Sequence, residues 1–187
     1  MVVLYQEGEF FVLRSCCKNR QKKGAGPAGM TITILCIGKM KDKALQLLEE
    51  EYIKRLQAFS KVQIIEVKDE ANTRADRENE ALLIRDKEGE RALAKIKDKD
   101  FVILLDLHGQ QWGSEDFAER LSAWSTANQS LVFVIAGSLG PSAALTARAN
   151  VRWQLSRLTF THLMTRVLVL EQIYRAFMIA SGRSYHK

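Results

Sequence analysis

The sequence predicts an α/β protein whose sheet is mainly parallel and carries helices on both faces. Two segments, residues 101–107 (FVILLDL) and 131–136 (LVFVIA), are almost continuously apolar, which is typical of strands covered on both sides. Between such segments apolar residues recur at helical spacing, so strands and helices alternate along the chain. This alternation is typical of parallel strands joined by right-handed crossover helices.

The first half of the pattern starts with a β-rich run at residues 31–37 (TITILCI), which Gly38 closes. A second strand is predicted at residues 62–67. The helix predicted between them, residues 43–59, repeats apolar residues at helical spacing: Leu45, Leu48, Tyr52, Leu56 and Phe59. Residues 72–97 predict a long, charge-rich helix that faces solvent, with its inner side formed by Leu82, Leu83, Leu93 and Ile96.

The second half begins with a helix for which Ser114 is the candidate N-cap, and which buries Phe117, Leu121 and Trp124. After the second apolar strand, Pro141 is expected at the first position of a short helix, which proline favours. A strand near residues 151–156 follows. A long final helix is predicted from about residue 161 to residue 180, where residues 181–182 (Ser-Gly) end it.

The length of 187 residues favours one folded domain, preceded by a segment of different composition. Residues 24–29 (GAGPAG) are typical of a flexible linker. The basic stretch before them follows an apolar patch, the reverse of the order in a secretory signal, and Glu7 and Glu9 disfavour a transit peptide. We expect residues 1–29 to be a disordered extension or a mis-assigned start, and residues 30–187 to be the domain.

Cysteine content and hydropathy indicate the compartment. The three cysteines lack the spacing of a disulfide framework or of a metal site: Cys16, Cys17 and Cys36. A reducing, cytoplasmic compartment is therefore expected, without a bound metal. No apolar run approaches the roughly 18 residues of a membrane span, so no membrane association is predicted.

Positive charge is concentrated in the C-terminal fifth of the chain. From Arg148 onward there are seven basic residues and one acid, Glu171, whereas residues 30–147 hold sixteen Lys and Arg against nineteen Asp and Glu. The chain ends in residues 184–187 (SYHK), after a helix with an apolar face. Tyr, His and Lys side chains stack on bases, exchange protons and neutralise phosphate, so this end indicates a nucleic-acid partner.

Two strand ends are candidate ligand loops, because open parallel sheets bind ligands beyond the carboxyl ends of their strands. They are residues 107–109 (LHG) and 137–140 (GSLG), where glycine lets backbone amides approach a ligand. Neither a GxGxxG nor a GxxxxGK[ST] motif is present, and glycine turns after strands are common. His108 and His162 are candidates for chemistry, although a lone histidine is more often packed or exposed, and Asp106 is expected to orient a loop.

With these motifs in view, residues 30–187 resemble the ribosomal RNA large subunit methyltransferase H family of the SPOUT class. The similar segments are TITILCIGKMKDK, EVKDE, KEGERALAKI, LLDLHG, IAGSLG, LSRLTFTH, LEQIYRAF and GRSYHK. The resemblance implies a C-terminal trefoil-knotted fold, a homodimer, and S-adenosyl-L-methionine as the methyl donor. The implied substrate is a pseudouridine in a stem-loop of 23S ribosomal RNA, methylated at N3 within assembled ribosomes.

The resemblance also implies roles for individual residues. The implied cofactor-binding residues are Leu105, Ala136, Gly137, Leu155, Ser156, Arg157, Leu158, Thr159 and Phe160. The tail would reach the cofactor pocket of the partner subunit, where His186 is our candidate proton acceptor and Tyr185 would stack on or orient the base. Arg166, Arg183 and Lys187 would bind RNA phosphates.

Two departures from the family pattern bear on these roles. The chain has Ala136-Gly137 where the family usually has Gly-Gly, so the alanine Cβ could crowd the cofactor. It has residues 161–163 as Thr-His-Leu instead of Pro-His-Gln, and His162 is therefore not assigned to catalysis. Two alternatives stay open from the residues: a non-catalytic RNA- or ribosome-binding module, and a flavodoxin-like enzyme that acts on small molecules.

Overall fold

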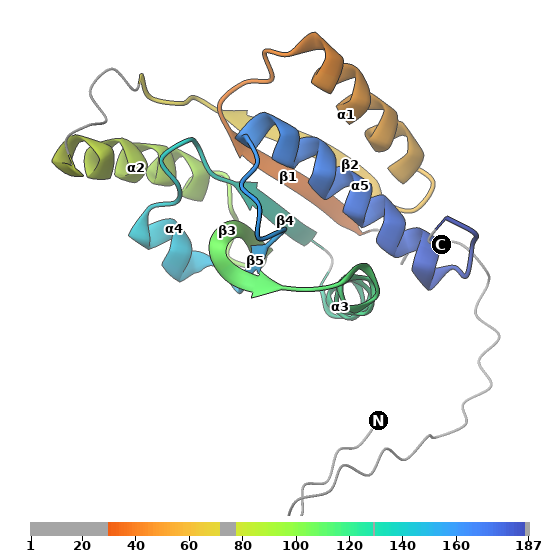
Figure 1. Cartoon of the computed structure of the whole chain (residues 1–187). Coiled ribbons are helices and arrows are strands. Elements are labelled where there is room, and N and C mark those ends of the chain that lie inside the picture. Colours follow the sequence, from red (N-terminus) through yellow and green to blue (C-terminus); the bar gives the residue numbers. More distant parts are fainter. Residues whose placement is uncertain (1–29, 72–77, 129, 186–187) are drawn as a thin grey trace, which may run out of the picture.

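The computed structural model describes residues 30–71, 78–128 and 130–185, and its centre is a five-stranded parallel sheet (Figure 1). The predictions for residues 1–29 lie outside these described residues. The strand order is β2-β1-β4-β3-β5. The strands are β1 (Thr31–Ile37), β2 (Lys61–Val67), β3 (Phe101–Gln111), β4 (Ser130–Ile135) and β5 (Val151–Gln154). Every strand pair is parallel, which confirms the predicted α/β class.

Helices cover both faces of the sheet (Figure 1). One face carries α1 (Lys43–Leu56), α3 (Ser114–Ala127) and α5 (His162–Ala180), and the other carries α2 (Glu78–Leu93) and α4 (Ala143–Arg148). Side chains alternate between two cores, so that Ile34 and Phe133 pack under the first group while Leu35 and Val134 pack under the second. The unbroken apolar runs of the sequence follow from this double coverage.

Several helix ends follow local rules that the sequence carries. Asp42 caps α1, where its Oδ1 accepts hydrogen bonds from the backbone N–H groups of Ala44 at 2.8 Å and Leu45 at 3.0 Å. Thr161 caps α5 through its hydroxyl oxygen, and Gly182 follows that helix with a φ of 64°. Among the described residues, no helix combines the length and the hydropathy that a membrane crossing requires.

Several predicted helix boundaries are wrong by a few residues. Helix α2 ends at Leu93 and not at residue 97, and Leu82 and Leu83, predicted on its inner side, are exposed. Helix α1 ends at Leu56, because Phe59 belongs to the turn that packs its ring on Phe177. Ser114 is the first residue of α3 and not its cap. Pro141 lies outside α4, since the hydroxyl oxygen of Ser142 accepts the N–H of Leu145 at 3.1 Å and makes Ser142 the cap.

The predicted ligand loop at residues 107–109 is part of a strand. Strand β3 continues to Gln111, and Trp153 of β5 pairs first with Leu105 and then, after a register shift, with Gln110. At Gly109 the two backbones approach so closely that a Cβ would lie 2.6 Å from the carbonyl carbon of Arg152. The glycine therefore serves strand pairing, and this loop is removed from the candidate ligand site.

Asp106 holds this irregular stretch together, as expected of a residue that orients a loop. Its Oδ2 accepts the Nε–H of Arg152 at 2.7 Å, and its Oδ1 accepts the backbone N–H of His108 at 2.9 Å. Burial alone would raise the pKa of Asp106, but these two hydrogen bonds and the positive charge of Arg152 hold it below its ordinary value.

Candidate active site

Three predicted cofactor segments meet at the carboxyl edge of the sheet. Leu105 pairs with Ile135 of β4 on one side and with Trp153 of β5 on the other. The residues that follow these strands, Ala136 after β4 and Leu155 after β5, therefore leave the sheet on either side of β3. Carboxyl ends of adjacent parallel strands are where such sheets bind ligands.

The connection of residues 155–161 crosses this edge. It starts at β5, the edge strand beside β3, and ends at α5, whose first residue lies against β1 (Figure 1). The ring Nε2 of His162 is 3.7 Å from the position that a Cβ on Gly38 would take, and Gly38 directly follows β1. Since β3 and β4 lie between β5 and β1, the connection passes over their carboxyl ends, next to residues 136–137.

The crossing connection presents apolar side chains to solvent. Leu158 is 69% exposed, and Phe160 is exposed as well. The backbone N–H of Leu158 donates to the hydroxyl oxygen of Ser156 at 3.0 Å, a local turn that holds this stretch. Apolar side chains of this size beside a glycine turn can cover the faces of a flat ring system.

The turn after β4 packs closely on the neighbouring elements α2 and β1. A Cβ at position 137 would lie 2.7 Å from Oε2 of Glu88 and 3.3 Å from Cγ2 of Ile37, so Gly137 has no space for a side chain. The N–H of Gly140 donates to the carbonyl of Gly137 at 3.1 Å, and Gly140 has a φ of 84°. Gly137 therefore packs closely on Glu88 of α2 and on Ile37 of β1.

The side chain of Ala136 lies in the core of the protein. Its methyl group is 9% exposed and belongs to the core on the α2 and α4 side of the sheet, together with Val134 and Leu145. The alanine that replaces the usual first glycine therefore adds a core contact.

The described part of the tail packs on its own subunit. The hydroxyl of Tyr185 donates to Oε1 of Glu171 at 3.2 Å, its ring meets Tyr174 edge-on at 5.0 Å, and the guanidinium of Arg175 lies 4.9 Å from the ring centroid. Burial, followed by hydrogen bonds with Tyr52 and Glu171, raises the pKa of Tyr185 to about 12. His186 and Lys187 lie outside the described residues.

Within one chain, the tail and the cofactor segments are far apart. Helix α5 has 19 residues, and a rise of 1.5 Å per residue makes it about 28 Å long. Its start is at the carboxyl edge, whereas Phe177 near its end stacks on Phe59, which precedes β2 at the opposite edge. A single chain therefore does not bring Tyr185 to the predicted cofactor segments.

Arg166 is not available to RNA, which corrects the expectation that it binds phosphate. Its side chain is 0% exposed, its Nη1 donates to Oε1 of Glu66 at 2.7 Å, and its Nη2 donates to the carbonyl of Gly38. Oε1 of Glu49 lies 4.0 Å from the same Nη1. Arg183, in contrast, is exposed, with its guanidinium 5.7 Å from the ring centroid of Phe59.

The two candidate histidines are separate from each other. His108 is exposed on the extension of β3. His162 is half-buried, and burial, followed by the positive charge of Arg166, lowers its pKa, although Asp69 opposes this shift. A proton acceptor at neutral pH is compatible with a lowered histidine pKa, but nothing brings His162 and the tail together within one chain.

Glu88 was missed by the sequence reasoning. It lies on α2 and is 4% exposed, with its carboxyl group directly against Gly137. In the sequence it is one acid among many on a charge-rich segment, and the adjacent Gly89 is the single hint of close packing.

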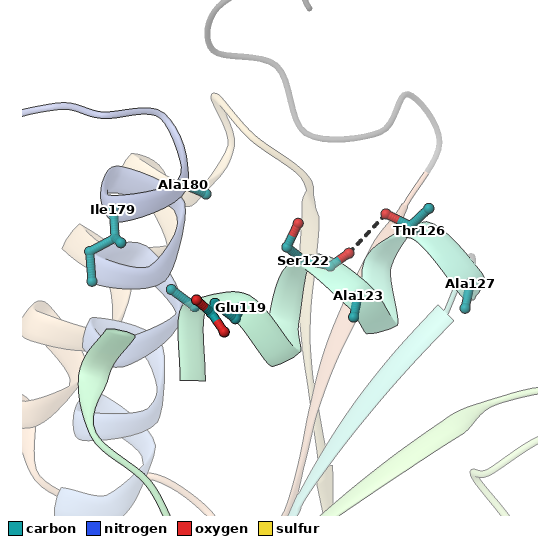
Figure 2. Close-up of a pocket in the computed structure, with 8 residues that line it drawn as sticks. Glu119, Ser122, Ala123, Thr126, Ala127, Ile179 and Ala180 are labelled. Carbon is teal, nitrogen blue, oxygen red and sulfur yellow. Dashed lines mark hydrogen bonds between the residues drawn. The ribbon is translucent and has the colours of Figure 1, made fainter. Parts of the chain in front are cut away.

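A groove of about 630 Å³ lies between α3 and the end of α5 (Figure 2). It is lined mainly by small side chains such as Ala123, Ala127 and Ala180, and the hydroxyl of Thr126 donates to the carbonyl of Ser122 in its own helix at 2.9 Å. It lies at the amino edge of the sheet, since α3 leads into the start of β4. The groove is thus remote from the candidate cofactor segments.

Comparison with known proteins identifies the family of the chain. The family described as Predicted SPOUT methyltransferase matches residues 30–186. The chain is 47% identical over 159 residues to the ribosomal RNA large subunit methyltransferase H of Latilactobacillus sakei, covering 84% of this chain and 100% of that relative. The corresponding proteins of Clostridium acetobutylicum and Heliobacterium modesticaldum are 45% and 43% identical, covering 84% and 83% of this chain and 100% and 98% of theirs. The chain therefore belongs to the SPOUT methyltransferase family.

Proposed function

We propose that this protein transfers a methyl group from S-adenosylmethionine to N3 of a pseudouridine in 23S ribosomal RNA, with the assembled ribosome as its substrate. The observation that carries the proposal is the meeting of Leu105, Gly137 and the crossing connection at one edge of the sheet. The names of relatives at 43–47% identity support the ribosomal RNA substrate. A ribosomal substrate places the activity in the cytoplasm.

The residues at the carboxyl edge would hold the cofactor. Backbone groups of residues 136–137 and 155–160 would contact the adenine edge, and the apolar side chains of Leu155, Leu158 and Phe160 would flank its ring. When bound, the cofactor supplies an electrophilic methyl group on a sulfonium. A Cβ at Gly140 would meet nothing within 4 Å, so the turn would leave space there for backbone contact with the nucleoside.

A homodimer would complete the site. Because Tyr185 lies at the far end of α5 from its own cofactor segments, the tail of a second subunit is the better source of the catalytic groups. The SPOUT class also implies a C-terminal trefoil knot, in which the crossing connection takes part. In such a dimer each site combines the carboxyl edge of one subunit with Tyr185, His186, Arg183 and Lys187 of the other.

His186 would accept the imide proton from N3, which leaves the nitrogen electron pair free to bond with the methyl carbon. The bond between carbon and sulfur breaks as the bond to N3 forms, and the donor leaves as a neutral thioether. Tyr185 would hold the base in line, and alignment of the two reactants supplies much of the acceleration. Arg183 and Lys187 would neutralise RNA phosphates.

The alternative of a non-catalytic RNA-binding module loses its main support in the structure. That alternative rested on crowding of the cofactor by Ala136, whose methyl group lies in the core. The flavodoxin-like alternative gives no account of the family match over residues 30–186.

A methylation assay tests the proposal. The full-length chain is incubated with isotope-labelled S-adenosylmethionine and with either assembled ribosomes or protein-free 23S RNA, both from cells that lack the modification. We expect label on ribosomes, recovered after digestion as N3-methylpseudouridine by mass spectrometry, and little on free RNA. Absence of transfer to either substrate, or label on another atom, would overturn the assignment.

A further inference from the structure

Glu171 is the one acid in the C-terminal fifth of the chain, and the reaction as described above does not use it. It lies on α5, and its side chain is 15% exposed. One of its oxygens, Oε1, accepts the Nη2–H of Arg175 at 2.6 Å and the hydroxyl of Tyr185 at 3.2 Å. The other, Oε2, accepts the Nε2–H of Gln172 at 2.6 Å. Both carboxylate oxygens are therefore engaged, and one of them binds the tail.

The chain returns along α5 to bring Tyr185 to this carboxylate. Gly182, with a φ of 64°, reverses the chain after the helix, and the backbone N–H of Arg183 donates to the carbonyl of Met178 at 3.0 Å. The N–H of Tyr185 then donates to the carbonyl of Arg183 at 2.9 Å. The phenol thereby lies beside residues 171–175, although it comes 14 positions after the acid that its hydroxyl contacts.

Contacts with α5 fix the pose of Tyr185. Its ring meets Tyr174 edge-on, with the centroids 5.0 Å apart and the planes at 84°, and the guanidinium of Arg175 lies 4.9 Å from the ring centroid. Its hydroxyl binds Glu171 and also faces the phenol of Tyr52 on α1. A ring contact restrains position loosely, whereas a hydrogen bond to a charged acceptor is directional and roughly twice as strong as a neutral one. Glu171 is therefore the contact that sets the angle of the ring.

We propose that Glu171 is a positioning residue for the methyl transfer, which holds Tyr185 in the pose that serves the cofactor edge of a second subunit. The inference rests on the proposed function. Since the hydroxyl of Tyr185 donates to Glu171, the group that this residue offers to the base is its ring and not its phenol proton. Chain ends fray unless contacts tie them down, and a misplacement of about 1 Å can lower a rate about 100-fold. The carboxylate thus acts on the reaction through the tail and touches neither reactant.

Single-turnover methylation of assembled ribosomes by the full chain, at saturating labelled S-adenosylmethionine, tests the inference. We expect Glu171→Ala to lower the rate about tenfold and to change the Kd of S-adenosylmethionine, measured by calorimetry, less than about threefold. Glu171→Gln keeps an oxygen that can accept the hydroxyl, so it should recover most of the rate. Glu51→Ala is the matched control, because it removes another (i, i+4) pair with an arginine, Arg55, and should leave the rate unchanged.

A double-mutant cycle separates positioning from general damage to the fold. If Glu171 acts through the hydroxyl of Tyr185, Tyr185→Phe should also lose about tenfold in rate, and adding Glu171→Ala to that variant should lose little more. Losses that multiply to about 100-fold would mean that the two side chains act independently, and they would overturn the inference. An unchanged rate in Tyr185→Phe, which keeps the ring and removes no charge, overturns it as well, even where Glu171→Ala does not fold.

The outcomes distinguish the inference from the proposed function. If the wild type and Glu171→Ala transfer label at the same rate, the role of Glu171 fails while the methyltransferase assignment stands. A rate in Glu171→Gln as low as in Glu171→Ala would assign the effect to the lost charge and would also overturn the inference. If the wild type transfers no label to ribosomes, the proposed function fails, and the inference fails with it.

Discussion

At its amino-terminal end, α5 begins beside apolar side chains that lie in solvent, whereas at its carboxyl-terminal end aromatic and charged side chains cover one another. Leu158 is 69% exposed and Phe160 is 38% exposed. Tyr185 is held by Glu171 and lies on the ring of Tyr174. The first end thus offers uncovered apolar surface, whereas at the second end the aromatic and charged side chains are held by contacts within the chain.

Beneath the exposed end, Arg166 forms the anchor of α5. Its replacement by methionine should cost about 3–5 kcal/mol, because Glu49 and Glu66 would lose their buried counter-charge. We expect the melting temperature to fall by on the order of 10 °C. Arg55→Met, which removes an exposed pair with Glu51, should cost about 1 kcal/mol or less. Equal losses of stability in the two variants would show that the buried Arg166 stabilises the fold no more than the exposed Arg55 does.

A substitution in the turn after β4 should give the next largest effect, a loss of affinity for S-adenosylmethionine. Gly137→Val places a Cβ 2.7 Å from Oε2 of Glu88, which is too close for a normal contact. The backbone of the turn must therefore move away from Glu88. We expect affinity for S-adenosylmethionine, measured by calorimetry, to fall about 10- to 100-fold. Gly113→Val is the control, since a Cβ there meets the Asp116 carboxylate at an ordinary 3.7 Å. Unchanged affinity in Gly137→Val would remove this turn from the cofactor site.

The parts of the fold that could be predicted from sequence are those in which one local rule decides. The β4 core run is unbroken because both faces of the strand are covered. The extension of β3 could not be predicted, since Asp106, His108 and Gln110 are polar and their pairing depends on β5, more than 40 residues further on. Strand pairing of this kind is set by tertiary contact and not by propensity.

For the candidate site, sequence indicates where loops follow strands and says nothing of which charges are buried. Position after a parallel strand marks residues 137–140 as a candidate loop, whereas the other candidate, residues 107–109, continues its strand. Charge in a sequence carries no record of burial, so Arg166 looked like a phosphate ligand although its partner, Glu66, lies 100 residues away. Glu88 was invisible for the same reason, because only the packing of α2 against Gly137 distinguishes it from its exposed neighbours.

The covered end of α5 should respond to loss of one hydroxyl. Tyr185→Phe removes the hydrogen bond to Glu171 and should lower the free energy of unfolding by about 1 kcal/mol. The raised pKa of Tyr185 means that its contribution is complete below about pH 10 and is lost as the pH rises toward about 12. Alkaline difference spectroscopy should show one late-titrating phenol fewer in the variant than in the wild type; an equal number in both proteins would place the shift on another tyrosine.

The smallest effect concerns the exposed cation beside the tail. Arg183→Gln should reduce the slope of log K against log salt concentration for ribosome binding by about 1, with a loss of only a few-fold in affinity, if Arg183 neutralises one phosphate. Arg120→Gln is a matched control, because both guanidinium groups are exposed and lie over an aromatic ring, Arg183 at 5.7 Å from Phe59 and Arg120 at 4.6 Å from Trp112. Arg120 belongs to α3, away from the tail, so its loss should leave the slope unchanged. Equal slopes in the two variants would mean that the tail end of α5 contributes general charge to the RNA encounter and no phosphate contact of its own.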